Sequence, residues 1–183
     1  SRIMKTGNGY LQGYNCQAIV DEDHQIIVAQ AATNQPPDQE HLQPLVAQAI
    51  ENCGRQPTRL TADAGYWSAD NAHFCDEHDV DAYIAPDRKP ETAEPEGSES
   101  EAALPRIRMR EKLASDEGRA TYKKRKHVVE PVFGQIKEAR GLRRFLLRGI
   151  EMIRGEWAIV CTAHNLLKLR TAKRGAGTNG VIA

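Results

Sequence analysis

The chain has 183 residues, with 25 Lys and Arg side chains balanced by 25 Asp and Glu side chains. That length suits one domain, or one domain with an appendage. Apolar residues make up 40% of the sequence, and no apolar run reaches the roughly 18 residues that a membrane span needs. The four cysteines include no Cys-x-x-Cys pair, which argues against a zinc ribbon or a disulfide framework and fits a reducing cytosol.

The zero net charge hides an uneven distribution. Residues 1–104 carry 6 basic and 18 acidic side chains, whereas residues 105–183 carry 19 basic and 7 acidic ones. A strongly basic half suggests a polyanionic partner such as nucleic acid. The alternative interpretation is that the two halves neutralise each other or that the charges are simply solvated.

The first part of the chain alternates predicted strands and helices. Residues 10–20 and 25–33 have the composition of strands, and the short polar segment between them predicts an antiparallel hairpin. No strand is predicted before Tyr10. The next elements, in order, are a helix capped by Asp38 and ending at Cys53-Gly54, a strand at 58–62, a helix capped by Ser68 and ending near His78, and a strand at 82–85.

The second part is predicted to be helical after an insertion. Residues 87–105 are acidic, contain three prolines and have almost no bulky apolar side chains, so we expect a mobile segment. Pro131 predicts a kink or a new helix start at Glu130, because proline lacks a backbone donor and disfavours helical angles in the residue before it. Helices are predicted at 106–115, 117–140 and 150–170, the last with Trp157, His164 and Leu167 on its packed side, and residues after Thr171 are expected to fray.

Two acidic residues stand out as candidates for chemistry. Asp63 follows a predicted strand, and ligand sites in α/β sheets favour the carboxyl ends of strands. Its carboxylate could hold a divalent cation, or it could be a turn aspartate. Glu130 follows the basic segment 123–127 and precedes Lys137 by seven residues, so on a helix the two share a face. An acid among donors suits a site where a metal meets a phosphate, and the alternative is a surface helix with ordinary ion pairs.

These residues together resemble the catalytic motifs of DDE transposases from bacterial insertion sequences. The resemblance lies in Ala62-Asp63-Ala64-Gly65-Tyr66 and in the pattern Tyr122-x2-Arg125-x4-Glu130-x6-Lys137. The family usually has three residues, not four, between the Arg and the Glu. Further matching stretches are 13–18, 129–137, 144–149 and 163–166, so that the resemblance covers about residues 1–170.

The resemblance implies an α/β fold, namely a ribonuclease H-like mixed sheet flanked by helices. It would occupy residues 1–171, with the insertion at 87–105 and a flexible tail at 172–183. In relatives the first catalytic Asp lies on the first strand, shortly before the stretch that matches residues 1–5. We therefore expect this chain to begin just past that strand and that Asp. Asp21, at the tip of the predicted hairpin, is the nearest substitute by sequence, and Asp38 is another.

The implied activity is DNA transposition with Mg²⁺, or Mn²⁺ as a substitute. Two ions would serve hydrolysis at the element ends and attack of the freed 3′-hydroxyl on target DNA. We expect Asp63 and Glu130 to hold them, with carboxyl groups within roughly 4–7 Å of each other. The residues expected to bind DNA are Tyr122, Arg125, Lys137, Lys126, Arg143, Arg144 and Arg148.

The expected partners are double-stranded DNA, at element ends and target, and a second copy of the chain when DNA is bound. The expected location is the bacterial cytoplasm, at the nucleoid and away from membranes. If the first Asp lies upstream, the 183-residue chain should bind DNA non-specifically but transpose poorly. Two alternatives stay open: a nuclease that cuts without strand transfer, and an inactive DNA-binding remnant.

Overall fold

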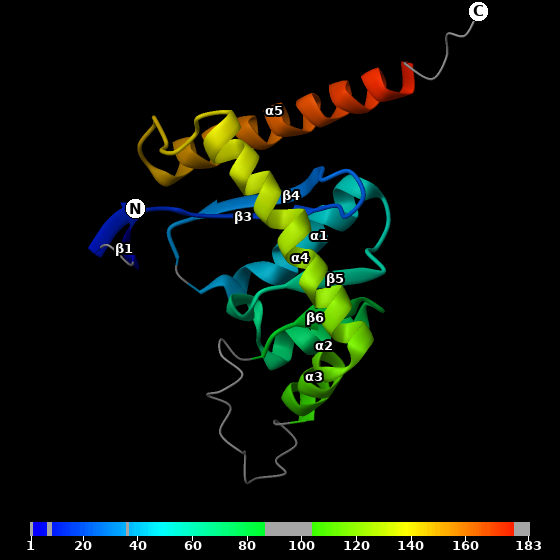
Figure 1. Ribbon diagram of the computed structural model, residues 1–183. Coiled ribbons are helices and arrows are strands. Elements are labelled where there is room, and N and C mark those ends of the chain that lie inside the picture. The colour runs from blue at the N-terminus through cyan, green and yellow to red at the C-terminus, as the bar shows by residue number, and fades with distance from the viewer. Residues whose placement is uncertain (1, 7–8, 36, 87–103, 178–183) are drawn as a thin grey trace, which may run out of the picture. The chain divides into compact units, whose positions relative to one another are not determined.

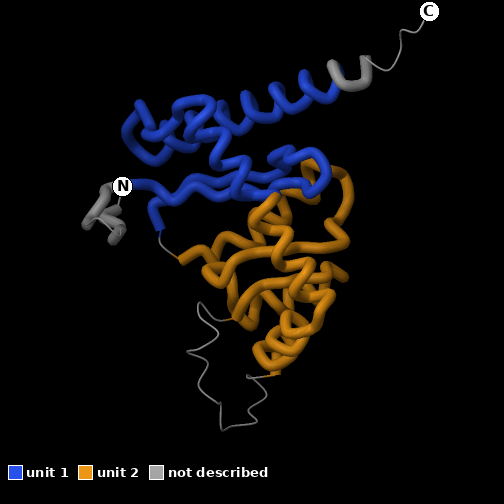
Figure 2. The backbone as a smooth tube through the Cα atoms, viewed as in Figure 1, with its two compact units in different colours: residues 1–36, 128–183 blue, residues 37–127 orange. Residues whose placement is uncertain are grey.

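A computed structural model describes residues 2–6, 9–35, 37–86 and 104–177, and for residues 2–6, 9–12 and 174–177 it describes the backbone alone. The fold is mixed α/β, as the sequence predicts (Figure 1). The chain divides into two compact units (Figure 2). Unit 1 consists of residues 1–36 and 128–183, and unit 2 consists of residues 37–127. None of the described helices is long and apolar enough to cross a membrane.

Unit 1 contains two antiparallel strand pairs. Strand β3 (Asn15–Val20) pairs with β4 (Ile27–Thr33), which confirms the predicted hairpin. Strand β1 (Arg2–Thr6) pairs with β2 (Gly9–Gly13). The prediction that no strand precedes Tyr10 is therefore wrong, and the stretch predicted as one strand divides at Tyr14. Gly13, immediately before this break, is a poor interior strand residue because it has no side chain to pack.

The helices of unit 1 differ from the prediction at two points. Helix α4 (Asp116–Gly134) continues through Pro131, so a new start at Glu130 is wrong. The irregularity comes later, in the π-helical turn η5 (Gln135–Ala139), where the Arg140 N–H donates to the Gln135 carbonyl at 3.1 Å. Helix α5 (Ile150–Gly177) extends six residues past Thr171, where fraying was expected.

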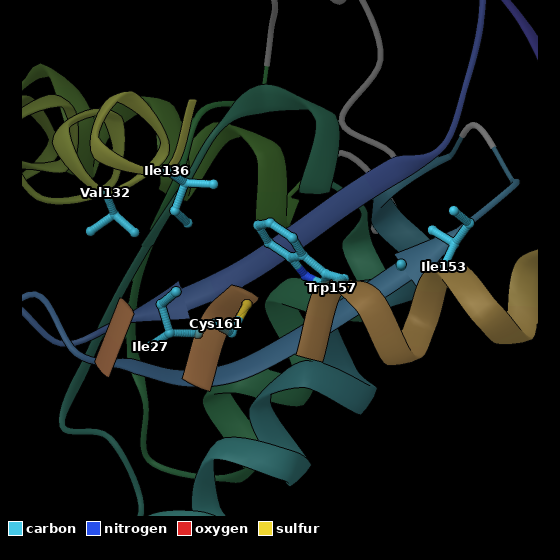
Figure 3. Packing of buried hydrophobic residues seen from close by; sticks show 7 residues of the cluster. Ile27, Val132, Ile136, Ile153, Trp157 and Cys161 are labelled. Atoms are coloured by element: carbon cyan, nitrogen blue, oxygen red, sulfur yellow. The ribbon is translucent and has the colours of Figure 1, made fainter. Parts of the chain in front are cut away.

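The core of unit 1 forms where α5 packs on the β3–β4 hairpin and on the end of α4 (Figure 3). Trp157 of α5 lies near its centre, only 3% exposed. Its ring stacks on Phe133 with centroids 5.9 Å apart, and its Nε1 donates to the Gln17 carbonyl at 3.3 Å. Burying a large apolar side chain contributes about 1.5–3 kcal/mol. The buried members are Ile27, Ala32, Val132, Ile136, Ile153, Trp157 and Cys161.

Polar side chains of α5 hold the backbone of the hairpin. Asn165 accepts from the Ile27 N–H and donates to the Ile27 carbonyl, both at 2.8 Å. His164 is completely buried, and its Nε2 lies 2.8 Å from the Gln25 carbonyl. Backbone groups at a strand edge need such partners when no further strand covers them. His164 and Asn165, which belong to the motif stretch 163–166, thus attach α5 to the β3–β4 hairpin. Leu167, predicted on the packed side, is 44% exposed.

Unit 2 begins with the 3₁₀ turn η1 (Asp38–His41) and helix α1 (Leu42–Cys53). Asp38 was predicted to cap this helix, but the residue before η1 is Pro37 and no side-chain cap bond forms there. The helix ends as predicted, because Gly54 adopts the left-handed conformation with φ 65°. Asp38 is the first residue of η1, and His41 occupies the cap position of α1.

The rest of unit 2 follows the prediction closely. Strand β5 (Arg59–Ala62) pairs in parallel with β6 (Asp81–Ile84). Helix α2 (Ala69–Glu77) is capped by Ser68, whose Oγ accepts from the Asn71 N–H at 3.0 Å. Helix α3 (Leu104–Ala114) follows, and then the first part of α4.

The strands described here form three two-stranded sheets, β1–β2, β3–β4 and β5–β6. A single ribonuclease H-like mixed sheet therefore stays a prediction. The predicted insertion at 87–105 overlaps α3 by two residues, since that helix starts at Leu104, and residues 87–103 lie outside the described residues. The same holds for residues 178–183 of the predicted tail.

Candidate functional site

Asp63 lies at the carboxyl end of β5, directly before the 3₁₀ turn η2 (Ala64–Tyr66). Its Oδ1 accepts a hydrogen bond from the Gly65 N–H at 2.9 Å, so it caps that turn. The interpretation as a turn aspartate is thus correct, and it does not exclude chemistry. The side chain is exposed, and the bond to Gly65 fixes the position of a carboxylate that solvent can reach.

A second carboxylate, that of Asp38, lies beside Asp63. A Cβ placed on Gly65 would lie 2.6 Å from Asp38 Oδ2 and 3.1 Å from Asp63 Oδ1. The two oxygens are therefore no farther apart than the sum of these distances, about 5.7 Å. A side chain at position 65 would push the Asp38 carboxylate away, so glycine allows the two carboxylates to approach here. Asp38 is a substitute ligand by sequence, but no sequence pattern predicts its position beside Asp63.

Two tyrosines border the carboxylate pair. Burial raises the pKa of Tyr66, and the negative charges of Asp38 and Asp63 raise it further. Burial also raises the pKa of Tyr122 in α4; the nearby Arg125 opposes this and Asp63 adds to it. Both phenols stay protonated at neutral pH and can donate hydrogen bonds.

Arg125 packs on Tyr122, with its guanidinium carbon 5.4 Å from the ring centroid. Its Nε is buried and has no hydrogen-bond partner among the residues that the structure describes. Tyr122 and Arg125, both predicted to bind DNA, thus lie with Asp63 in unit 2, although about sixty positions separate them in the sequence. The structure brings these three motif residues together.

The carboxylates of Asp38 and Asp63 supply some, but not all, of the ligands that a hard cation needs. Carboxylate oxygens are the ligands that Mg²⁺ prefers, and Asp38 and Asp63 supply them from two chain segments. Within the described ranges, no group of three or more His, Cys, Asp or Glu side chains could hold a metal ion. The pair fits Mg²⁺ chemically, and a further ligand is needed to complete the site.

Glu130 and Lys137 belong to unit 1. Glu130 is exposed on α4, and Lys137 is exposed in η5. Lys137 lies close to Cys16: burial raises the pKa of that thiol to about 12, and the lysine charge opposes the rise. Asp63 and Glu130 lie in different units, so the expected approach of their carboxyl groups stays a prediction.

The other predicted site residues are found in unit 1, except Lys126. Asp21 Oδ2 accepts from the His24 N–H at 2.7 Å, so it closes the turn between β3 and β4. A role for Asp21 as a metal ligand stays a prediction. Arg143 forms an ion pair with Glu138. Five of the predicted DNA-binding residues are exposed to solvent: Lys126, Lys137, Arg143, Arg144 and Arg148.

A family model for the transposase DDE domain matches residues 1–166 of the chain. The chain belongs to the transposase DDE domain family. The family indicates DNA transposition, and hence DNA binding. Searches of curated proteins and of solved structures each found no significant match.

Proposed function

We propose that this transposase DDE domain cuts DNA phosphodiester bonds at element ends and joins the freed 3′-hydroxyl to target DNA. Asp63 and Glu130 would hold Mg²⁺, with Asp38 as a further oxygen donor beside Asp63. One observation supports the proposal most strongly. The motif residues Asp63, Tyr122 and Arg125 lie near one another in unit 2, so that a carboxylate, a phenol and a guanidinium are grouped there.

When bound, a pair of Mg²⁺ ions supplies activation of the attacking oxygen and stabilisation of the leaving oxygen. Asp63 contributes a carboxylate whose orientation the Gly65 N–H fixes. Glu130, on the same helix as Tyr122, contributes the second acidic group. The carboxylates concentrate negative charge that would repel DNA, so cationic residues must accompany them.

Arg125 and Tyr122 fill that need in unit 2. The guanidinium presents several N–H donors in a plane, which matches the oxygens of a phosphate. The raised pKa of Tyr122 keeps its hydroxyl protonated, so that it donates to a phosphate oxygen rather than repelling it. Lys137 adds a positive charge after Glu130. The exposed residues Lys126, Arg143, Arg144 and Arg148 would follow the DNA backbone, which predicts a steep dependence of binding on salt.

The test compares Asp63→Asn with Asp76→Asn. Asp76 is an exposed aspartate of α2 in the same unit and is the matched control. We expect Asp63→Asn to lower Mg²⁺-dependent nicking by about 10²–10³-fold, the usual loss when one charge-stabilising group is removed. Non-specific DNA binding should persist, because the cationic residues remain.

The products separate the activities. Joining of cut ends to target DNA identifies a transposase, whereas cutting without joining identifies a nuclease. DNA binding without any cutting would indicate the inactive remnant. If Asp63→Asn cuts DNA as fast as Asp76→Asn, Asp63 is not a metal ligand of the reaction and the proposal is wrong.

A further inference from the structure

Helix α5 is apolar on two faces. Its inner face carries Ile153, Trp157 and Cys161 into the core of unit 1 (Figure 3). A second face is solvent-exposed, and a helix that is apolar all round is normally covered on every side. The large side chains of this second face are Met152, Ile159, Leu166 and Leu169, with exposed fractions of 55, 71, 61 and 52%.

The exposed side chains follow a coiled-coil spacing. Met152, Ile159 and Leu166 recur every seven residues, and Leu169 follows three residues later. Gly155 and Thr162 complete the same alternation of three and four residues. We call these six residues the α5 seam. A heptad seam of this kind packs against another helix by inserting side chains between those of the partner.

We propose that the α5 seam is the interface with a second copy of this chain, with the two α5 helices antiparallel. Antiparallel packing places Gly155 opposite Leu166, Met152 opposite Leu169, and Ile159 opposite Thr162. Each of these three facing pairs then contains at least one large apolar side chain. The space above Gly155 is open, since a Cβ there would meet nothing within 4 Å, and it can receive the second copy's leucine.

Charge distribution also favours a second, antiparallel copy. The start of α5 carries Glu151, Arg154 and Glu156, of which Arg154 and Glu151 form an ion pair, and its later part carries Arg170 and Lys173. Antiparallel helices bring the start, which has one net negative charge, beside the basic end of the other copy, and they oppose the helix dipoles favourably. Parallel helices would align like charges and leave Gly155 facing Gly155. The α5 seam is therefore complementary in shape and charge to a second α5 seam. A two-fold dimer interface requires this, because both copies contribute the same surface.

The proposal needs no DNA and does not rest on the proposed function, so each can fail without the other. The test is sedimentation equilibrium of the full chain without DNA, over a range of concentrations. Leu166→Glu removes a seam residue, and Leu167→Glu is the matched control, because Leu167 is an exposed leucine of α5 outside the seam. Circular dichroism checks that both variants remain folded.

We expect the unchanged chain to dimerise in a concentration-dependent way. Leu166→Glu should weaken dimerisation at least about tenfold, because it places two carboxylates in an apolar contact, whereas Leu167→Glu should change it by less than about twofold. The proposal is overturned if the chain is monomeric at every concentration or if both variants weaken dimerisation equally. It is also overturned if the seam binds anionic lipid vesicles while the chain remains monomeric.

Cysteine cross-linking tests the orientation. Gly155→Cys and Leu166→Cys are made in a Cys53→Ser chain, because Cys53 is the exposed native cysteine. A mixture of the two chains should form a disulfide between positions 155 and 166, and each chain alone should form little. Efficient cross-linking of each chain with itself would mean parallel helices and would overturn the antiparallel arrangement.

Discussion

Replacing Gly65 by alanine tests whether Asp38 and Asp63 act as a pair. The added Cβ would lie 2.6 Å from Asp38 Oδ2 and 3.1 Å from Asp63 Oδ1. An unstrained contact between carbon and oxygen is about 3.3 Å or longer. The Asp38 carboxylate must therefore retreat by about 0.7 Å, and Asp63 by a few tenths of an ångström.

The free energy of unfolding should change little. The displaced atoms are the ends of short side chains, and an off-rotamer torsion costs about 0.5–1.5 kcal/mol. Alanine restricts the unfolded chain more than glycine does, which stabilises by about 0.4–1 kcal/mol. The two contributions nearly cancel. Metal affinity should fall by about 10–100-fold, the usual range when groups that orient ligands are disturbed.

Calorimetric titration with Mn²⁺ measures the affinity, and urea unfolding measures the stability. Gly134→Ala is the control, because a Cβ there meets nothing within 4 Å. Asp38→Asn should lower the affinity as Gly65→Ala does. If Gly65→Ala binds Mn²⁺ as tightly as Gly134→Ala at equal stability, Asp38 and Asp63 do not hold the ion as a pair.

Two further predictions concern charge in unit 1. Burial lowers the pKa of His164, and the charges of Arg140 and Lys168 lower it further against the opposing hydrogen bond to the Gln25 carbonyl. Between pH 6.5 and the lower pKa of the folded state, His164 binds a proton in the unfolded chain but not in the folded chain. The melting temperature should therefore fall as the pH drops through 6.5, and it should level off below the folded pKa. The His164→Gln variant should show a smaller change over the same pH range. Arg144→Ala should lower the salt dependence of DNA binding by about one unit of slope, measured by fluorescence anisotropy at several salt concentrations, and an unchanged slope would remove Arg144 from the contact.

Elements with local signals could be predicted from the sequence. The β3–β4 hairpin, strands β5 and β6 and the Ser68 cap depend on neighbouring residues, such as the Ser68 hydroxyl that meets the Asn71 N–H. The pair β1–β2 was missed because its first strand, Arg2–Thr6, is largely polar. The dipeptide Gly7-Asn8 that follows it in the sequence is itself a hairpin signal and could have revealed the pair.

Only those residues of the candidate site that belong to a sequence motif could be predicted. Asp63 was found through the residues that follow it, and Tyr122 and Arg125 through their spacing to Glu130. The position of Asp38 depends on how η1 meets η2, which are 25 positions apart at these aspartates, and no local pattern carries that information. Its position before α1 favoured a cap, which is the usual role of an aspartate there.

Pro131 shows why a local rule fails at the centre of the motif. Proline removes one helical hydrogen bond and disfavours helical angles in Glu130, yet α4 remains helical through both residues. The next turn carries Val132 and Ile136, which are 0% and 2% exposed in the core of unit 1. Burying two such side chains contributes about 3–6 kcal/mol, which offsets the roughly 3 kcal/mol that an interior proline costs, so packing overrides the propensity. Tyr122, Arg125 and Glu130 therefore belong to the same helix, α4.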